Sequence, residues 1–197
     1  FQDINGILMD ELELKLSMEQ SLANKFERQL KEETERRKFA EAELALIKGI
    51  EPTELHKKVQ IVVFGKKQEN VYVLLLKTTD QRGGFWQNIT GNVESENLLE
   101  AAKRELEEEI GIKIKNIIDL KKILQFTDQY NRKIEEHCYA TLIDPMPQKI
   151  TISAKEHTQY SWKFVKDIKS NNYGFKSNFE IFQFSLQVLK NEKLVNL

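Results

Sequence analysis

The sequence predicts an α/β fold preceded by a long N-terminal helix, and three features of its residue pattern support this prediction. Residues 7–48 contain neither glycine nor proline and are rich in Glu, Lys, Leu and Ala, which favour helix. After residue 52 the pattern changes to short apolar runs such as VQIVVF at 59–64, which are typical of buried strands. Between these runs lies an amphipathic segment, residues 91–112, that ends in a cluster of glutamates. We therefore expect a helical segment over residues 1–52 and an α/β domain over residues 53–197.

The N-terminal segment has the residue spacing of a coiled coil. Alternating steps of three and four residues select one seam along the helix: Met9, Leu12, Leu16, Glu19, Ala23, Phe26, Leu30, Glu33, Arg37, Ala40, Leu44 and Ile47. A single straight helix cannot cover its own apolar stripe, so we expect it to pair with the same helix of a second subunit in a homodimer. The alternative is an extra helix that folds back on its own domain. Residues 49–52 are expected to form the helix stop and a linker.

The second domain alternates strand and helix patterns. Strands are expected over 58–65, 71–77, part of 113–123, 124–127, 136–143 and 160–165, with a closing helix over 179–190. Strands arranged around helices suit an α/β/α sandwich, in which helices cover both faces of the sheet.

Composition limits the class of protein. Charged residues make up 31% of the chain and the net charge is −1, which gives no field for nucleic acid or an anionic membrane. No apolar run approaches the roughly 20 residues that span a bilayer. Cys138 is the only cysteine, so we expect no intrachain disulfide, a cytoplasmic location, and a buried rather than a reactive thiol. The first residue is Phe1 rather than methionine, and we expect the natural chain to begin earlier.

The glutamate cluster lies on one face of the predicted helix. The side chains divide into an apolar stripe, a solvent-facing set and a third face: Leu99, Ala102, Leu106 and Ile110; Glu100, Lys103 and Glu107; and Glu105, Glu108 and Glu109. The three carboxylates of the third face repel one another and lie near the negative end of the helix dipole. A hard cation such as Mg²⁺ would relieve this repulsion. The alternative is an ordinary acidic face in contact with water.

The pattern around these acids carries a family resemblance. Residues 104–112, RELEEEIGI, resemble the second half of the Nudix box, R-E-U-x-E-E-x-G-U with U aliphatic. Glu96 stands eight residues before Arg104, as the box glutamate does, Gly91 opens the loop and Gly111 ends the helix. The loop departs from the usual box because the four residues 92–95 make it one residue short. The chain is thus similar to the Nudix hydrolases, which cleave nucleoside diphosphates linked to another moiety, and the resemblance implies a mixed sheet in an α/β/α sandwich.

The resemblance also implies roles for the box residues. Glu105 and Glu109 would be the principal ligands of Mg²⁺, for which Mn²⁺ can substitute, and Glu108 would be a further ligand or a base acting through water. Arg104 would pair with Glu96 and hold the loop on the helix. The alternative is a surface ion pair worth under about 1 kcal/mol.

Residues outside the box resemble one group within the Nudix hydrolases. The run 85–91, FWQNITG, the run 156–162, EHTQYSW, and Asn178 resemble segments of the bacterial dihydroneopterin triphosphate pyrophosphatases. This implies removal of pyrophosphate from a pterin triphosphate or from a nucleoside triphosphate such as dATP. The substrate-binding candidates are Lys77, Arg82, Phe85, Trp86, Gln87 and Asn178. For the lysine and arginine the alternative is a solvated side chain, and for the aromatic residues it is core packing.

The same resemblance makes Glu156 a metal ligand from outside the box. Three glutamates on one helix approach a cation from one side only, so another group must complete its coordination. Glu136 is the competing acid, and an exposed loop carboxylate is the plain alternative for Glu156. His157 is expected to support the ligands from behind or to be exposed.

Two other functions remain open at this point. One is a Nudix hydrolase of dinucleoside polyphosphates or nucleotide sugars. The other is a non-catalytic Nudix domain that senses a nucleotide and signals through the N-terminal helix.

Overall fold

The computed structural model describes residues 2–49, 55–94 and 96–195, with side chains described from Leu16 onward except at 19. Phe1, Ser95 of the box loop and all of the expected linker except Gly49 therefore lie outside the described residues. Clustering of the chain gives two compact units. One comprises Phe1–Thr53 with Thr127–Arg132, and the other comprises Glu54–Phe126 with Lys133–Leu197.

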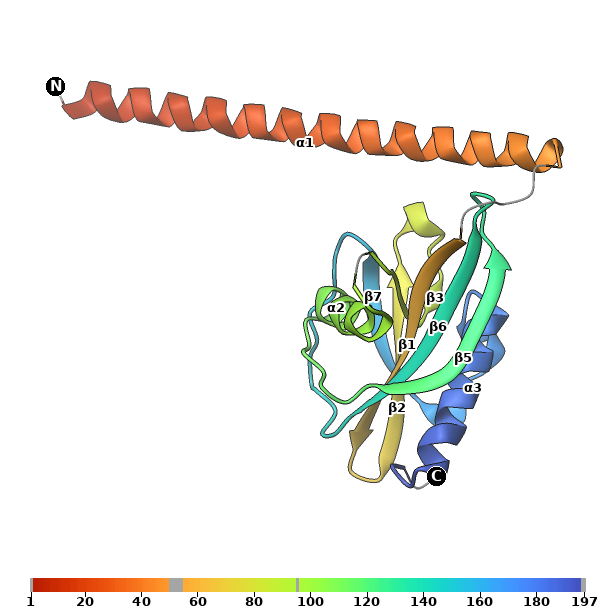
Figure 1. The fold of residues 1–197 in the computed structure, drawn as a ribbon. Helices are drawn as coiled ribbons and strands as arrows, with labels where there is room; N and C mark the ends of the chain where they lie inside the picture. The colour runs from red at the N-terminus through yellow and green to blue at the C-terminus, as the bar shows by residue number, and fades with distance from the viewer. Residues whose placement is uncertain (1, 50–54, 95, 196–197) are drawn as a thin grey trace. The chain divides into compact units, whose positions relative to one another are not determined.

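The first unit is built on one continuous helix, α1, which spans Gln2–Ile47 (Figure 1). Its expected seam is exposed where side chains are described: Leu30 is 67% exposed and Ile47 is 77% exposed. The turn Thr127–Arg132 contacts another face of α1, because the Tyr130 ring packs edge-on against Phe39 at 6.5 Å. Among the described residues, no helix is both long enough and apolar enough to cross a bilayer.

The second unit contains a mixed sheet. Its strands are β1 (Leu55–Lys67), β2 (Asn70–Thr78), β3 (Trp86–Gln87), β4 (Ile89–Asn92), β5 (Ile118–Thr127), β6 (Lys133–Ile143) and β7 (His157–Phe164). The order along the sheet is β3-β2-β1-β6-β5, with β4 paired to β1 and β7 paired to β2. The pairing of β1 with β6 is parallel, whereas β2 and β4 run antiparallel to β1.

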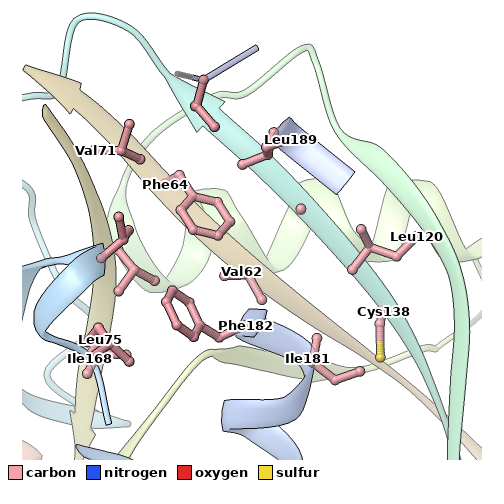
Figure 2. Close-up of a cluster of buried hydrophobic side chains, with 14 of the residues drawn as sticks. Val62, Phe64, Val71, Leu75, Leu120, Cys138, Ile168, Ile181, Phe182 and Leu189 are labelled. Atoms are coloured by element: carbon pink, nitrogen blue, oxygen red, sulfur yellow. The ribbon is translucent and has the colours of Figure 1, made fainter. Parts of the chain in front are cut away.

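Helices α2 (Leu98–Ile110) and α3 (Lys176–Asn191) cover opposite faces of this sheet (Figure 1). On the α2 face, Val59 and Ile61 of β1 belong to the same buried cluster as Leu106. On the α3 face, Phe64 and Phe182 belong to one buried cluster (Figure 2), and their ring centroids lie 6.0 Å apart. Each such side chain stabilises the fold by about 1.5–3 kcal/mol when fully buried. The expected α/β/α sandwich is confirmed.

Three short 3₁₀ turns connect these elements: η1 (Asp80–Arg82), η2 (Val165–Asp167) and η3 (Ser170–Asn172). The expected strand at 124–127 is wrong as a separate element, because β5 is one strand that continues past an irregular residue, Lys121, at φ 53°. The last strand begins at His157 rather than at Tyr160.

The apolar stripe expected on α2 is partly wrong. Leu106 and Ile110 are fully buried, but Leu99 is 39% exposed. Glu105 and Glu109 are buried as well, at 6% and 1% exposed. The helix therefore directs two of its three clustered carboxylates into the protein, from the face that the sequence pattern assigned to a cation.

Candidate functional site

Helix α2 is fixed at both ends. The Asn97 side chain accepts a hydrogen bond from the amide of Glu100 at 3.0 Å, which caps the first turn. Gly111 ends the helix in the left-handed conformation at φ 71°, and its amide bonds to the Glu107 carbonyl at 3.0 Å. Both ends of the helix that carries the glutamates are therefore capped.

The three glutamates of the predicted metal face differ in burial. Glu105 and Glu109 are 6% and 1% exposed, whereas Glu108 is exposed. Burial raises the pKa of Glu105 to about 7, against the opposing effect of Arg104. Burial also raises the pKa of Glu109, against the opposing hydrogen bond to His157. Keeping both carboxylates ionised in this site therefore requires a positive charge nearby.

Gly91 makes room for Glu105. A Cβ atom at position 91 of β4 would lie 1.8 Å from the carboxyl carbon of Glu105, so any side chain there would displace it. The glycine at the start of the box loop is therefore required by the close approach of the strand to the helix carboxylate.

Arg104 joins the box loop to the helix. Its Nε and Nη2 donate to Glu96 Oε1 at 3.0 and 2.8 Å, and Nη2 also donates to the Asn92 carbonyl at 2.7 Å. Its Nη1 donates to Glu105 at 2.7 Å and to Glu108 at 3.3 Å. These contacts lower the pKa of Glu96, chiefly through the hydrogen bond from Arg104. The guanidinium thus fixes both the loop and the orientation of Glu105.

A second segment, residues 153–157, brings further ligand groups to the end of α2. The amide of Ser153 donates to the backbone carbonyl of Glu109 at 3.1 Å, and the amides of Glu156 and His157 return to the Ser153 carbonyl. The turn is thereby attached to a helix carbonyl that has no partner within the helix. It places Glu156 and His157 beside the Glu109 side chain.

Glu109, Glu156 and His157 form the candidate metal cluster. One ligand atom from each lies within 4.8 Å of the other two. His157 is 2% exposed, and its Nε2 lies 2.8 Å from Glu109 Oε2. The other carboxylate oxygen, Glu109 Oε1, is buried and has no hydrogen-bond partner in the described part of the chain. An ionised carboxylate with an unsatisfied buried oxygen fits a hard cation, and Glu156 supplies a carboxylate oxygen from a second segment of the chain.

The cluster differs from the predicted set of metal ligands. Glu156 lies close to Glu109, and the family resemblance implied that both are ligands. Neither Glu105 nor Glu108 belongs to the group of mutually close ligand atoms. His157 contacts the Glu109 carboxylate directly and is not exposed. Sequence spacing did not identify this contact, because the two residues are 48 positions apart. The one local signal was the position of His157 directly after Glu156.

Glu136, the competing acid, lies elsewhere. Its Oε2 accepts from Gln60 Nε2 at 3.1 Å. Since Val59 and Ile61 face α2, Gln60 and its partner Glu136 lie on the α3 side of the sheet. The sheet therefore separates Glu136 from the metal cluster.

Four of the six predicted substrate-binding residues lie in β2, in β3 or in the turn η1 between them. Lys77 and Trp86 are paired between β2 and β3, and both are half-buried, while Arg82 forms an ion pair with Glu156. Gln87, also in β3, donates to Thr90 at 3.4 Å.

The remaining two predicted substrate-binding residues, Phe85 and Asn178, contact other segments of the domain. The Phe85 ring packs edge-on against Phe175 at 4.8 Å. The Asn178 side chain accepts from the amide of Asn88 at 3.1 Å, so it fastens the start of α3 to the segment before β4. The structure therefore gives Asn178 a buried internal partner.

The model of one known protein family matches this chain. The NUDIX domain model matches residues 54–182, well over half of the chain. Among curated proteins, 107 residues are 32% identical to an octanoyltransferase of Myxococcus xanthus, covering 53% of this chain and 29% of that protein. The chain thus spans less than a third of the length of that relative.

Three solved structures illustrate the shared fold. The E. coli dihydroneopterin triphosphate pyrophosphohydrolase has a TM-score of 0.57 and 24% identity, covering 68% of this chain and 99% of that one. The NUDIX domain of Shewanella oneidensis NrtR, complexed with ADP ribose, has a TM-score of 0.57 and 18% identity, covering 70% and 89%. A C. elegans Ap4A hydrolase has a TM-score of 0.56 and 18% identity, covering 69% and 98%. At these identities the likeness shows the fold alone.

Proposed function

Because the chain belongs to the NUDIX domain family of phosphoanhydride hydrolases, we propose that it is a Mg²⁺-dependent pyrophosphohydrolase that cleaves a pterin or nucleoside triphosphate to the monophosphate and pyrophosphate. The observation that carries the proposal is the cluster of Glu109, Glu156 and His157, with one buried Glu109 oxygen free of any described partner. Carboxylate oxygens that converge from a helix and a loop suit a hard divalent cation, with Mn²⁺ as a substitute.

The residues of the chain have distinct roles in this proposal. When bound, the cation would neutralise phosphate charge and lower the pKa of a water. Glu109 and Glu156 would hold it, and His157 would keep Glu109 in its ligating orientation. The exposed carboxylate of Glu108 suits a proton acceptor for the attacking water, and Glu105 would support the site from the adjacent turn. Lys77 and Arg82 would contact the phosphate chain.

The choice of a pterin or nucleoside triphosphate rests on the residues outside the box. The FWQ and EHxxYxW runs support it, as does the fold shared with the E. coli dihydroneopterin triphosphate pyrophosphohydrolase. Dinucleoside polyphosphates and nucleotide sugars are the alternative substrates. A non-catalytic sensor is the alternative of another class, and the NUDIX domain complexed with ADP ribose shows that the fold accommodates such a ligand. Cytoplasmic location belongs to the same proposal, since Cys138 is a free buried thiol.

One assay separates these functions. Phosphate products would be measured with Mg²⁺ over a panel of dihydroneopterin triphosphate, dNTPs, dinucleoside polyphosphates and nucleotide sugars, with Glu109→Gln as the inactive control. We expect pyrophosphate release from a triphosphate at the highest kcat/KM. Faster cleavage of another panel member would overturn the substrate assignment, and binding without cleavage of any member would favour the sensor.

We further propose that α1 forms a homodimer through its seam. Taking about 100° per residue, the surface that meets the Thr127–Arg132 turn, around Phe39 and the buried Ala42, lies opposite the seam. That turn therefore leaves Phe26 and Leu30 exposed, at 62% and 67%. In a parallel pair, Arg36 of one helix would also meet Glu41 of the other.

Light scattering on the full chain tests the dimer. Phe26→Glu with Leu30→Glu should give monomers, because two charges would enter the apolar seam. The matched control, Ser21→Glu with Asn24→Glu, adds the same two charges at exposed positions outside the seam and should remain dimeric. A monomeric unsubstituted chain would refute the proposal, and a fragment starting near Pro52 that still dimerises would move the interface to the second domain.

A further inference from the structure

Arg82 is presented to the metal cluster by a small closed loop. The amide of Gly84 donates to the Thr79 carbonyl at 3.0 Å, and the amide of Phe85 donates to Thr78 Oγ1 at 3.0 Å. The amide of Thr79 donates to the backbone carbonyl of Glu156 at 3.0 Å. The loop is therefore fastened to the residue whose side chain Arg82 contacts.

The contact itself is an ion pair between Arg82 Nη1 and Glu156 Oε2. Both side chains retain access to solvent, at 49% for Arg82 and 37% for Glu156. The charge of Arg82 also acts on Glu109, where it is one of the groups that oppose the raised pKa. The guanidinium thus provides positive charge to the same two carboxylates that are proposed to hold a cation.

A divalent cation and Arg82 compete for this position. A cation held by Glu156 would share that carboxylate with the guanidinium of Arg82, and the two positive groups would repel one another. The half-exposed Arg82 side chain has room to turn away, whereas Glu109 is buried and fixed by His157. A guanidinium released beside a phosphate-binding site can bind two phosphate oxygens at once.

We propose that Arg82 is an exchangeable counter-ion of the site: it pairs with Glu156 until a divalent cation binds there, and it then moves to the phosphate chain of the substrate. The inference rests on the proposed function, because it requires the metal site. It adds a coupling between metal and substrate: cation binding frees the residue that binds phosphate, and by linkage phosphate strengthens cation binding by the same factor.

Metal binding without substrate tests the competition. Mn²⁺ would be titrated into the full chain and followed by electron paramagnetic resonance, for the unsubstituted protein, Arg82→Gln and Lys155→Gln. Because Arg82→Gln removes the competing ion pair, we expect Mn²⁺ to bind about three- to fivefold more tightly. Lys155→Gln is the matched control, since it removes one exposed positive charge next to Glu156 in sequence, and it should change affinity less than Arg82→Gln.

The sign of the change decides the result. Equal or weaker Mn²⁺ binding by Arg82→Gln would overturn the exchange and leave the proposed enzyme intact, because Arg82 would then only orient Glu156. An equal gain in Lys155→Gln would also overturn it, since general charge would explain the effect. Failure of the unsubstituted chain to bind Mn²⁺ at all would refute the metal site itself.

Phosphate binding tests the second half of the exchange. Inorganic pyrophosphate would be titrated by calorimetry at saturating Mg²⁺ and without metal. We expect Mg²⁺ to tighten pyrophosphate binding in the unsubstituted protein, and Arg82→Gln to weaken the metal-dependent binding about tenfold. Arg82→Lys should recover part of this loss. Pyrophosphate affinity unchanged by Arg82→Gln would overturn the proposal.

Discussion

Glu109 and Glu136 are both buried glutamates, but they lie on opposite faces of one sheet and have different neighbours. Their exposures are 1% and 5%, and burial raises the pKa of each, to about 7 for Glu136. Glu109 lies beside His157 and Glu156, with one oxygen free of described partners. Glu136 shares a hydrogen bond with Gln60 and belongs to no such cluster among the described residues. A raised pKa therefore marks a buried acid, and only the neighbouring groups separate a metal ligand from a structural carboxyl.

The largest contrast should come from replacing each acid by its amide. Glu109→Gln removes a ligand charge, and we expect kcat to fall about 10³-fold with the fold retained. Glu136→Gln should keep kcat within about twofold, because it lies across the sheet from the cluster. Steady-state kinetics at saturating Mg²⁺, with circular dichroism to verify folding, provide the measurement. Near-normal turnover by Glu109→Gln would show that Glu109 is not a ligand of the catalytic cation.

Gly91→Ala should have the next largest effect. The added methyl group would occupy the position of the Glu105 carboxylate and displace it. We expect kcat/KM to fall about 100-fold, the range found for residues that support metal ligands. Thr90→Ala is the neighbouring control on β4, and it should be much milder. Equal activity of Gly91→Ala and the unsubstituted chain would show that Glu105 need not lie under β4.

Glu156→Gln should change the metal requirement more than the maximal rate. With one ligand oxygen weakened, we expect half-maximal activity to need about tenfold more Mg²⁺. Glu136→Gln should give the same Mg²⁺ curve as the unsubstituted protein. The reverse pattern would identify Glu136 as the ligand and contradict the arrangement of the cluster.

The smallest effect on catalysis, and the clearest on stability, belongs to Glu136. Its folded pKa is raised from 4.5 to about 7, so the folded state binds a proton more tightly than the unfolded chain. The corresponding stability is present below about pH 4.5 and is lost as pH rises to about 7, amounting to roughly 3 kcal/mol. Urea unfolding across this range should show that loss relative to Glu136→Gln. Parallel pH curves for the two proteins would contradict the buried titration.

The sequence predicts the elements whose signals are local. The end of α2 at Gly111 and the helical run of α1 follow from residue type and spacing, and the structure has both. Residue spacing also places Glu105, Glu108 and Glu109 on neighbouring positions of one helix face. It does not determine which of them is buried, because that depends on β4 lying against Glu105 through Gly91.

Contacts between distant segments could not be predicted in this way. The approach of His157 to Glu109 depends on the hydrogen bond from Ser153 to the end of α2. The exposure of Leu99, in the first turn of α2, depends on how far along the helix the core extends. Both depend on tertiary packing, which a helical wheel of the sequence does not represent.

Glu109 contributes two separable groups, a side-chain carboxylate to the cluster and a backbone carbonyl to Ser153. A replacement at this position removes the first and keeps the second. If Glu109 holds the cation as proposed, the loop that carries Glu156 would then stay in place around a site that has lost its activity. In evolutionary terms, one nucleotide change in a glutamate codon, to glutamine, could convert the enzyme into a binding protein without rebuilding its pocket. On this proposal, one side chain decides whether the domain cleaves its ligand or only binds it.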